Sequence, residues 1–415
     1  MRPPGQSISR TGGKPIKIDI VVHGRFHGFA LGKALLELGH DVVVHTNYPR
    51  SVVEEFGIPR KLVRSFLAHG IGTRLSSKLG ALQPMAVTEP FFHKLFGRWA
   101  ARSVRPDSDL IYGFSGVMKE LLRSPRCHAG QLRAVVRGSS HIREQARLLE
   151  EEERRVGVPI DRPSPWMIAR EEKEYLLADC ILVLSSFAFN SFVEQGVDRR
   201  RLLLNPLGVN LSQFSPEADV IEARVKRVMS GEPLRVLNVG TFSFRKGAAD
   251  LVHVAQALES KIELRFVGDR PKECQHLLRT SNQYIAFNDR VPEAKLNAAY
   301  KDADIFIFPT IEDGFAAVLL QAQASGLPII ATPNSSAPDF LEEGKTGWVV
   351  PIRRADLFIQ RLEWCDANRA AVASMVKYLG LRKFARTWSD MAHELMDHYY
   401  AIAKDLRGSR FSQTR

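Results

Sequence analysis

Cysteine is scarce in this chain, with four in 415 residues. They are Cys127, Cys180, Cys274 and Cys365, and no two of them form a C-x-x-C pair. This spacing predicts neither a disulfide framework nor a zinc site. Long hydrophobic runs are also missing, because no apolar stretch approaches the roughly 20 residues that a membrane-spanning helix needs. We therefore expect a cytoplasmic protein in a reducing environment, with any membrane contact peripheral.

Several catalytic signatures are absent as well. The glycine-bearing loop from Gly24 to Gly28 does not match G-x-G-x-x-G, so a dinucleotide cofactor is not expected. The sequence contains no H-E-x-x-H motif, and Gly113–Gly116 does not match the G-x-S-x-G of hydrolases. His23 and His27 have the spacing of helical metal ligands but are expected where a strand leads into a loop, and no carboxylate or cysteine lies between them. We predict neither a cofactor nor a metal ion.

Positive charge is what the chain has in excess, with a formal net charge of +12. Such a charge favours an anionic partner, whether nucleotide phosphates, an acidic membrane surface or nucleic acid. Two stretches, residues 60–78 and 91–105, combine cations with aromatic and aliphatic residues. Basic, apolar helices of this kind can lie on an anionic membrane. They can equally be ordinary amphipathic helices whose apolar side packs in the core and whose charged side faces solvent.

The order of apolar segments predicts an α/β protein. Residues 18–22 and 41–46 are typical of buried strands, and residues 29–38 between them of a helix that ends at Gly39. Further strands are expected at 110–112, 133–136, 180–185 and 201–205. The second half repeats the plan, with strands expected at 235–239, 263–267, 284–287, 305–308 and 328–331 and helices at 248–258, 294–303 and 315–324. We expect two Rossmann-like, doubly wound domains that face each other across a cleft.

Composition predicts where the N-terminal tail, the two domains, the linker and the C-terminal segment begin and end. Residues 1–16 are polar and rich in proline and glycine and are expected to form a flexible tail. The N-terminal domain is expected to cover residues 17–204, a linker 205–216, and the C-terminal domain 217–385. Residues 386–415 hold an amphipathic helix that we expect to pack back on the N-terminal domain, followed by a tail.

The segment from Ile305 to Pro328 is the most informative part of the sequence. A buried strand ends at Phe308, an acidic turn with Gly314 follows, and a helix then runs to Gly326. A strand–turn–helix unit places a helix N-terminus at the carboxyl edge of a parallel sheet. That edge is where α/β proteins bind anions.

These motifs resemble those of the family 4 glycosyltransferases of GT-B architecture, and the resemblance extends from about Ile18 to the C-terminal helix. The family's strand–Gly–x5–Lys–Gly pattern is similar to Asn238–Gly247, and its E-x7-E motif is similar to the segment from Asp313 to Gln321, with Ala-Ser-Gly-Leu-Pro following at 324–328. The resemblance implies transfer of a sugar from a nucleotide-sugar (UDP- or GDP-linked) to a glycan, lipid-linked or other hydroxyl acceptor, with retention at the anomeric carbon and without a metal.

Arg245 and Lys246 are the predicted diphosphate-binding residues. They follow a strand and are flanked by Gly240 and Gly247. Without a metal, side chains must neutralise the charge that develops on the departing diphosphate, and an arginine fork with a lysine suits that task. The family has an arginine where this chain has Thr241, so Arg245 is expected to compensate. The alternative is a solvated pair in the first turn of a helix.

The turn and helix that follow the strand at 305–308 are predicted to hold the sugar and the ribose. By resemblance, Asp313 contacts the donor sugar and Gln321 the ribose, although both positions depart from the family's glutamates. Glu312 could share the sugar-facing role. The backbone of Gly314, Phe315 and Ala316 opens the helix and would point N–H groups at the diphosphate. The alternative is an acidic helix cap with a solvated face.

Other candidate residues complete the predicted site. His141 is similar to the family's histidine near the donor sugar, although a single histidine is more often structural. Arg137, Gly24 and Arg25 are expected near the acceptor, and the backbone at Arg290 and Val291 is the expected base pocket.

Two other functions stay open. A catalytically silent nucleotide-sugar-binding protein would account for the changes at Asp313 and Gln321. A nucleic-acid-binding protein would account for the charge, but no known nucleic-acid module accompanies it.

Overall fold

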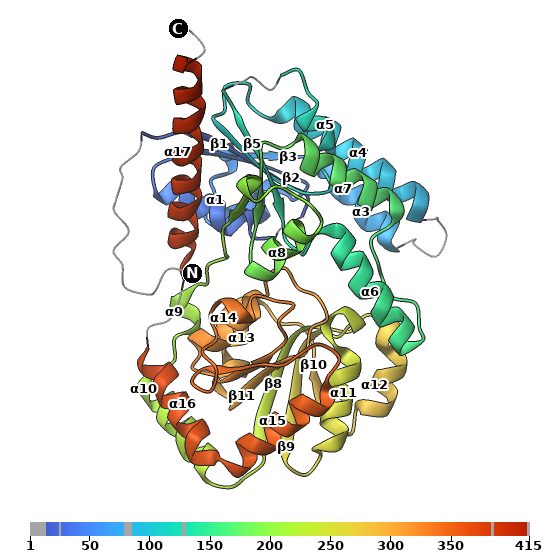
Figure 1. Cartoon of the computed structure of the whole chain (residues 1–415), viewed down its shortest axis with the longest axis vertical. Coiled ribbons are helices and arrows are strands. Elements are labelled where there is room, and N and C mark those ends of the chain that lie inside the picture. The colour runs from blue at the N-terminus through green and yellow to red at the C-terminus, as the bar shows by residue number, and fades with distance from the viewer. Residues whose placement is uncertain (1–13, 25, 79–84, 127–129, 383–385, 413–415) are drawn as a thin grey trace.

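The computed structural model describes residues 14–24, 26–78, 85–126, 130–382 and 386–412. These residues form two parallel β-sheets, each covered by helices, and the two sheet-containing domains lie one above the other in Figure 1. Among the described helices, none is both long enough and apolar enough to cross a membrane.

The N-terminal domain is built on a seven-stranded sheet with the order β3-β2-β1-β4-β5-β6-β7. Its strands are β1 (Lys17–Val22), β2 (Asp41–Thr46), β3 (Val63–Ser65), β4 (Leu110–Phe114), β5 (Leu132–Arg137), β6 (Cys180–Val183) and β7 (Leu202–Leu204). Its helices are α1 (Gly28–Glu37), α2 (Arg50–Glu54), α3 (Leu67–Lys78), α4 (Met85–Ser103), α5 (Lys119–Leu122), α6 (Ile142–Val156), α7 (Pro165–Leu177) and α8 (Ser186–Glu194). All neighbouring strands are parallel, so their carboxyl ends share one edge.

Alternation along β1 divides this domain into two layers of core. Ile18, Ile20 and Val22 pack into the cluster that contains residues of α1 and α17 (Trp388–Ser412). Val21 faces the opposite side and packs with Phe96 of α4. Successive strand residues point to opposite faces, so α4 covers the face of the sheet opposite to α1 and α17.

The C-terminal domain has a six-stranded parallel sheet in the order β10-β9-β8-β11-β12-β13. Its strands are β8 (Leu234–Thr241), β9 (Ile262–Asp269), β10 (Ile285–Asn288), β11 (Ile305–Phe308), β12 (Ile329–Ala331) and β13 (Gly347–Val349). Its helices are α10 (Ala218–Met229), α11 (Ala248–Ala257), α12 (Gln275–Ser281), α13 (Glu293–Lys301), α14 (Ala317–Ala324), α15 (Ala355–Ala367) and α16 (Arg369–Leu381). This strand order places a topological switch point between β8 and β11, where doubly wound sheets bind ligands.

The chain crosses between the domains twice. The predicted linker at 205–216 contains the single-turn helix α9 (Leu211–Phe214). The returning segment lies beside it, because the backbone N–H of Val209 donates to the Arg386 carbonyl over 2.8 Å. A Cβ added to Gly208 would lie 2.3 Å from the backbone nitrogen of Trp388. After this second crossing, α17 packs along α1 of the N-terminal domain, at the left of Figure 1.

Some expected elements differ from the structure. Residues 60–66 do not continue the helix expected there: they form a 3-10 turn (Arg60–Leu62) and the edge strand β3, and the helix starts only at Leu67. The sequence analysis did not predict β3 or β13, which are three residues long and acquire their backbone partners only through β2 and β12. Helix α14 begins at Ala317, two residues later than expected.

Candidate functional site

The carboxyl edges of the two sheets meet at three short segments. Residues 138–141 follow β5, the 3-10 turn Phe244–Lys246 follows β8, and residues 309–316 follow β11. Contacts across the domains are close here, because a Cβ added to Gly314 would lie 2.3 Å from the Cα of Ser139. Only glycine permits this approach, so Gly314 sets the distance between the two edges.

Glu312 lies at the centre of this contact. Its side chain is fully buried, and its Oε1 accepts hydrogen bonds from the backbone N–H and the hydroxyl of Ser140, over 2.9 and 2.8 Å. Its Oε2 accepts from Gln145 Nε2 over 3.1 Å and from Arg245 Nε over 2.9 Å. One carboxylate therefore joins a cation of the C-terminal domain to the N-terminal domain.

The charge on Glu312 is stable in this setting. Burial by itself would raise the pKa of the carboxyl, but Arg245, Lys246 and the two hydrogen bonds from Ser140 outweigh it and hold the pKa at about 2. Glu312 is an anion at neutral pH, placed beside the two cations that the sequence assigns to a diphosphate.

Lys246 is paired in the same way. Its Nζ lies 2.6 Å from Asp313 Oδ2, and burial lowers the pKa of the ammonium despite that carboxylate. The backbone around it is fixed: Gly247 has a φ of 77°, and a Cβ there would lie 1.9 Å from the Pro309 carbonyl oxygen. Gly247 is thus required both because its φ is positive and because there is no room for a side chain.

A polar network extends from Glu312 into the N-terminal domain. Gln145 Oε1 accepts from Arg137 over 2.6 Å, and the same guanidinium donates to Glu171 over 2.9 Å. Arg245 also donates to the Ser139 hydroxyl over 2.9 Å. The structure thus brings Arg137, Arg245 and Glu312 into one network, with Arg137 holding Gln145.

His141 adjoins this network but its ring is engaged in the fold. Its Nδ1 accepts from the Arg143 backbone N–H over 3.2 Å and caps α6, and the ring packs between Tyr175 and Phe192. Burial lowers the pKa of His141 to about 4, so the imidazole is neutral at pH 7. A role near the donor sugar stays a prediction.

This burial predicts an acid-sensitive contribution to stability. The folded pKa of His141 lies below the ordinary value of 6.5, so the unfolded chain binds the extra proton and stability falls as the pH drops from 6.5 to 4. We expect His141→Asn, which keeps a capping acceptor, to reduce that loss in the free energy of unfolding by about 3 kcal/mol. Denaturant unfolding at pH 7 and pH 4 measures it. The control is His276→Asn, at an exposed histidine. An equal loss of stability in acid for the wild type and His141→Asn would contradict the buried position of His141.

Gln321 lies within the C-terminal domain, on α14. Its Oε1 accepts from the Tyr300 hydroxyl over 3.0 Å, and its Nε2 donates to Glu293 Oε1 over 3.3 Å. Glu293 is exposed at the first position of α13, two residues after Val291, and Arg290 and Val291 are exposed too. A carboxylate therefore lies beside the amide that replaces the family's glutamate.

The remaining predicted residues are placed as follows. Gly240 (φ 152°) and the exposed Thr241 end β8. Phe315 donates its backbone N–H to Asp313 Oδ1 over 3.1 Å, which holds the turn before Ala316, the N-cap of α14. Gly24 donates its backbone N–H to Asn47 Oδ1 over 2.9 Å, and Arg25 lies outside the described residues.

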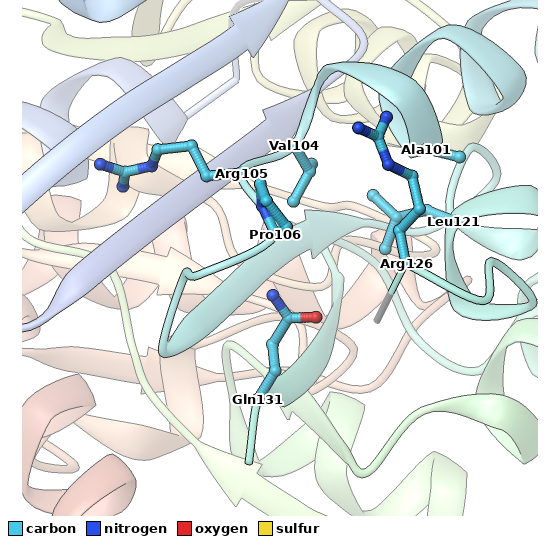
Figure 2. Close-up of a pocket in the computed structure, with 7 residues that line it drawn as sticks. All are labelled: Ala101, Val104, Arg105, Pro106, Leu121, Arg126 and Gln131. Atoms are coloured by element: carbon cyan, nitrogen blue, oxygen red, sulfur yellow. The ribbon is translucent and has the colours of Figure 1, made fainter. Parts of the chain in front are cut away.

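A pocket elsewhere in the N-terminal domain is too small for a substrate. It holds about 10 Å³, room for one water molecule at most. The residues that line it, shown in Figure 2, are Ala101, Val104, Arg105, Pro106, Leu121, Arg126 and Gln131. Pro106 and Gln131 precede β4 and β5, so this pocket lies at the amino edge of the sheet, away from the facing edges.

Sequence reasoning missed four residues that the structure places in the site: Ser139, Ser140, Gln145 and Glu293. The two serines follow Arg137 at the carboxyl end of a predicted strand, which is a usable signal for polar contacts at that edge. Gln145 and Glu293 gave no such signal, because their partners Glu312 and Gln321 are distant in the sequence.

Comparison with known proteins decides the family of the C-terminal domain. Residues 233–368, which contain Arg245, Lys246, Glu312 and Gln321, match the family model described as Glycosyl transferases group 1. The C-terminal domain belongs to the group 1 glycosyltransferases. The two facing Rossmann-like domains have the GT-B fold expected from the sequence: the structure of HepE from Anabaena, solved with UDP and glucose, is similar over 93% of this chain and 100% of HepE, with a TM-score of 0.63 and 14% identity.

Two curated relatives are similar to longer parts of the chain. WcaL of Escherichia coli, named for glycosyl transfer in colanic acid biosynthesis, is 26% identical over 199 residues, 44% of this chain and 47% of WcaL. A GDP-mannose-dependent alpha-mannosyltransferase of Mycobacterium tuberculosis is 27% identical over 263 residues, 62% of this chain and 64% of the relative. The chain thus matches about half to two thirds of the length of these relatives.

Proposed function

We propose that this protein is a retaining, family 4 glycosyltransferase that moves a hexosyl or related sugar from a nucleoside-diphosphate sugar to a hydroxyl acceptor in polysaccharide or glycoconjugate synthesis. The observation that carries the proposal is the pair Arg245 and Lys246, held by glycine-dependent backbone at the meeting carboxyl edges of a GT-B fold. The names of the relatives support both a nucleotide-sugar donor and a polysaccharide product.

In this reaction the bond between the anomeric carbon and the diphosphate oxygen breaks, and the acceptor oxygen forms a bond to the same carbon. The acceptor hydroxyl gives its proton to the released nucleoside diphosphate. Arg245 and Lys246 would stabilise the developing negative charge, so no metal is required for that task. A diphosphate would compete with Glu312 for Arg245, and the Glu312 contacts to Ser140 would then hold the domains together around the donor.

Other residues take positioning roles in the proposal. Asp313 and Glu312 would accept hydrogen bonds from sugar hydroxyls, and the Gln321–Glu293 pair would hold the ribose, with Glu293 supplying the carboxylate that Gln321 lacks. The backbone at Arg290 and Val291 would contact the base. The acceptor would approach from the loop at Gly24 in the N-terminal domain.

One observation favours a second candidate, a protein that binds a nucleotide-sugar without transferring it. Both cations are already paired with carboxylates of their own domain, over 2.8 Å for Arg245 with Glu312 and 2.6 Å for Lys246 with Asp313. If those pairs persist with donor bound, the diphosphate gains no cation as it departs.

A panel of UDP-, GDP- and ADP-linked sugars separates these functions. We expect one donor to raise the melting temperature of the purified protein and to release free nucleoside diphosphate slowly in the absence of acceptor. Stabilisation without release, even with candidate acceptors present, would favour the silent binding protein. No stabilisation by any donor would contradict both.

A further inference from the structure

The surface of α3 and α4 is the most unusual part of this molecule outside the site. Residues 60–105 contain nine lysines and arginines and a single acidic residue, Glu89, a net charge of +8. That is two thirds of the net charge of the whole chain, which is +12, in about a ninth of its length. A charge concentrated in this way marks a surface that meets an extended anionic partner.

An apolar stripe runs through this basic region. Leu67, Ile71 and Leu75 are four residues apart on α3, so they lie on one side of the helix, and they are 46%, 58% and 55% exposed. Phe91 of α4 is 59% exposed. The inner side of α3 is already packed, since the ring of His69 contacts those of Phe92 and Phe96 of α4. The stripe is therefore not required by the core.

Cations flank the stripe on α4 and on the 3-10 turn and strand β3 that precede α3. Lys61, Arg64, Lys94, Arg98 and Arg102 are all exposed. No salt bridge involves any of these five within the ranges that the structure describes, whereas many other cations of the chain, such as Arg133 and Lys261, are paired with carboxylates. Exposed aliphatic and aromatic side chains bordered by cations without salt bridges suit the boundary between lipid headgroups and acyl chains, where the apolar groups meet the acyl chains and the cations meet the phosphates.

This surface is joined directly to the N-terminal side of the site. Gly70 on the inner side of α3 packs on Asn47, where a Cβ would lie 2.2 Å from the Asn47 carbonyl oxygen. The Asn47 side chain in turn accepts from Gly24 in the loop after β1. In that loop, Phe26 is 68% exposed and stacks on Phe114. In Figure 1, α3 and α4 lie at the right of the N-terminal domain and α17 at the left, so α17 leaves this surface open.

We propose that the α3–α4 surface, defined by Leu67, Ile71, Leu75 and Phe91 with the five flanking cations, docks the protein onto an anionic phospholipid bilayer. The apolar stripe enters the headgroup region while the cations pair with lipid phosphates. The docking itself does not depend on the glycosyltransferase activity. Its use to present a lipid-linked acceptor to the loop at Gly24 rests on the proposed function.

Vesicle co-sedimentation tests this surface with the full chain and without any sugar donor. We expect the wild type to bind vesicles of phosphatidylcholine with phosphatidylglycerol and not vesicles of phosphatidylcholine alone. Ile71→Glu with Leu75→Glu should lower the partition coefficient by about tenfold or more. The matched control, Leu176→Glu with Leu381→Glu, makes the same change at leucines that are 69% and 86% exposed elsewhere, and should bind like the wild type.

A second variant tests the charge. Lys94→Gln with Arg98→Gln should lower binding to anionic vesicles by about tenfold. Absence of wild-type binding to anionic vesicles, equal binding by the stripe variant, or tighter binding to duplex DNA than to vesicles would each overturn the proposal. Thermal stabilisation by the nucleotide-sugar donor, measured on the same proteins, separates this proposal from the proposed function. If only the membrane-docking proposal is wrong, the donor still stabilises the wild type. If the proposed function is wrong, no donor stabilises it.

Discussion

Replacement of Lys246 by alanine is expected to slow nucleoside diphosphate release from the preferred donor by about 10²- to 10³-fold. Loss of a single preorganised group that stabilises developing negative charge typically has that effect on turnover. The variant also leaves Asp313 without the ammonium that lies 2.6 Å away, so an uncompensated carboxylate would face the diphosphate and add repulsion. Donor-induced thermal stabilisation should disappear with the activity.

Lys261 supplies the matched control for this prediction. Its Nζ lies 2.8 Å from Glu363 in an exposed pair of the same domain, between α11 and β9 and remote from the facing edges. Lys261→Ala should retain both donor binding and release. If Lys246→Ala releases diphosphate at the wild-type rate, the diphosphate binds elsewhere and the assignment of Arg245 and Lys246 is wrong.

Replacement of Glu312 by alanine is expected to lower the free energy of unfolding by about 3–5 kcal/mol, the usual result of removing one partner from a buried ion pair. Arg245, Ser140 and Gln145 would lose their shared acceptor at the point where the domains meet. For domains of this size the apparent melting temperature should fall by roughly 10 °C. Thermal unfolding followed by circular dichroism measures the change.

Glu363→Ala is the matched control, because it removes a carboxylate that is 44% exposed from the pair with Lys261. That change should alter stability by about 1 kcal/mol or less. Acid adds a second readout: the pKa of Glu312 lies near 2, below its ordinary value of 4.5, so its stabilisation is complete above pH 4.5 and is lost as the pH falls toward 2. Glu312→Gln should not show this loss of stability in acid. If the melting temperature of Glu312→Ala lies within error of the wild-type value, the contact between the domains at Glu312 is weak.

The sequence by itself determined the parts of this protein that depend on local pattern. Strand β2 and strand β11 have the predicted bounds, Asp41–Thr46 and Ile305–Phe308, because continuous apolar runs bounded by turn residues specify buried parallel strands. The cations after β8 and the acidic turn after β11 could be placed at a carboxyl edge for the same reason. Alternation of strands and helices along the chain was enough to predict two Rossmann-like domains.

Tertiary structure alone decided how those pieces act on one another. The sequence does not show that Glu312 is the buried link between the domains, because its partners Ser140 and Gln145 lie 172 and 167 residues away. The same holds for the exposed stripe on α3, which is indistinguishable in sequence from an apolar core side. Burial and partnership are properties of packing between distant segments, and periodicity shows which residues share a face but not what that face meets.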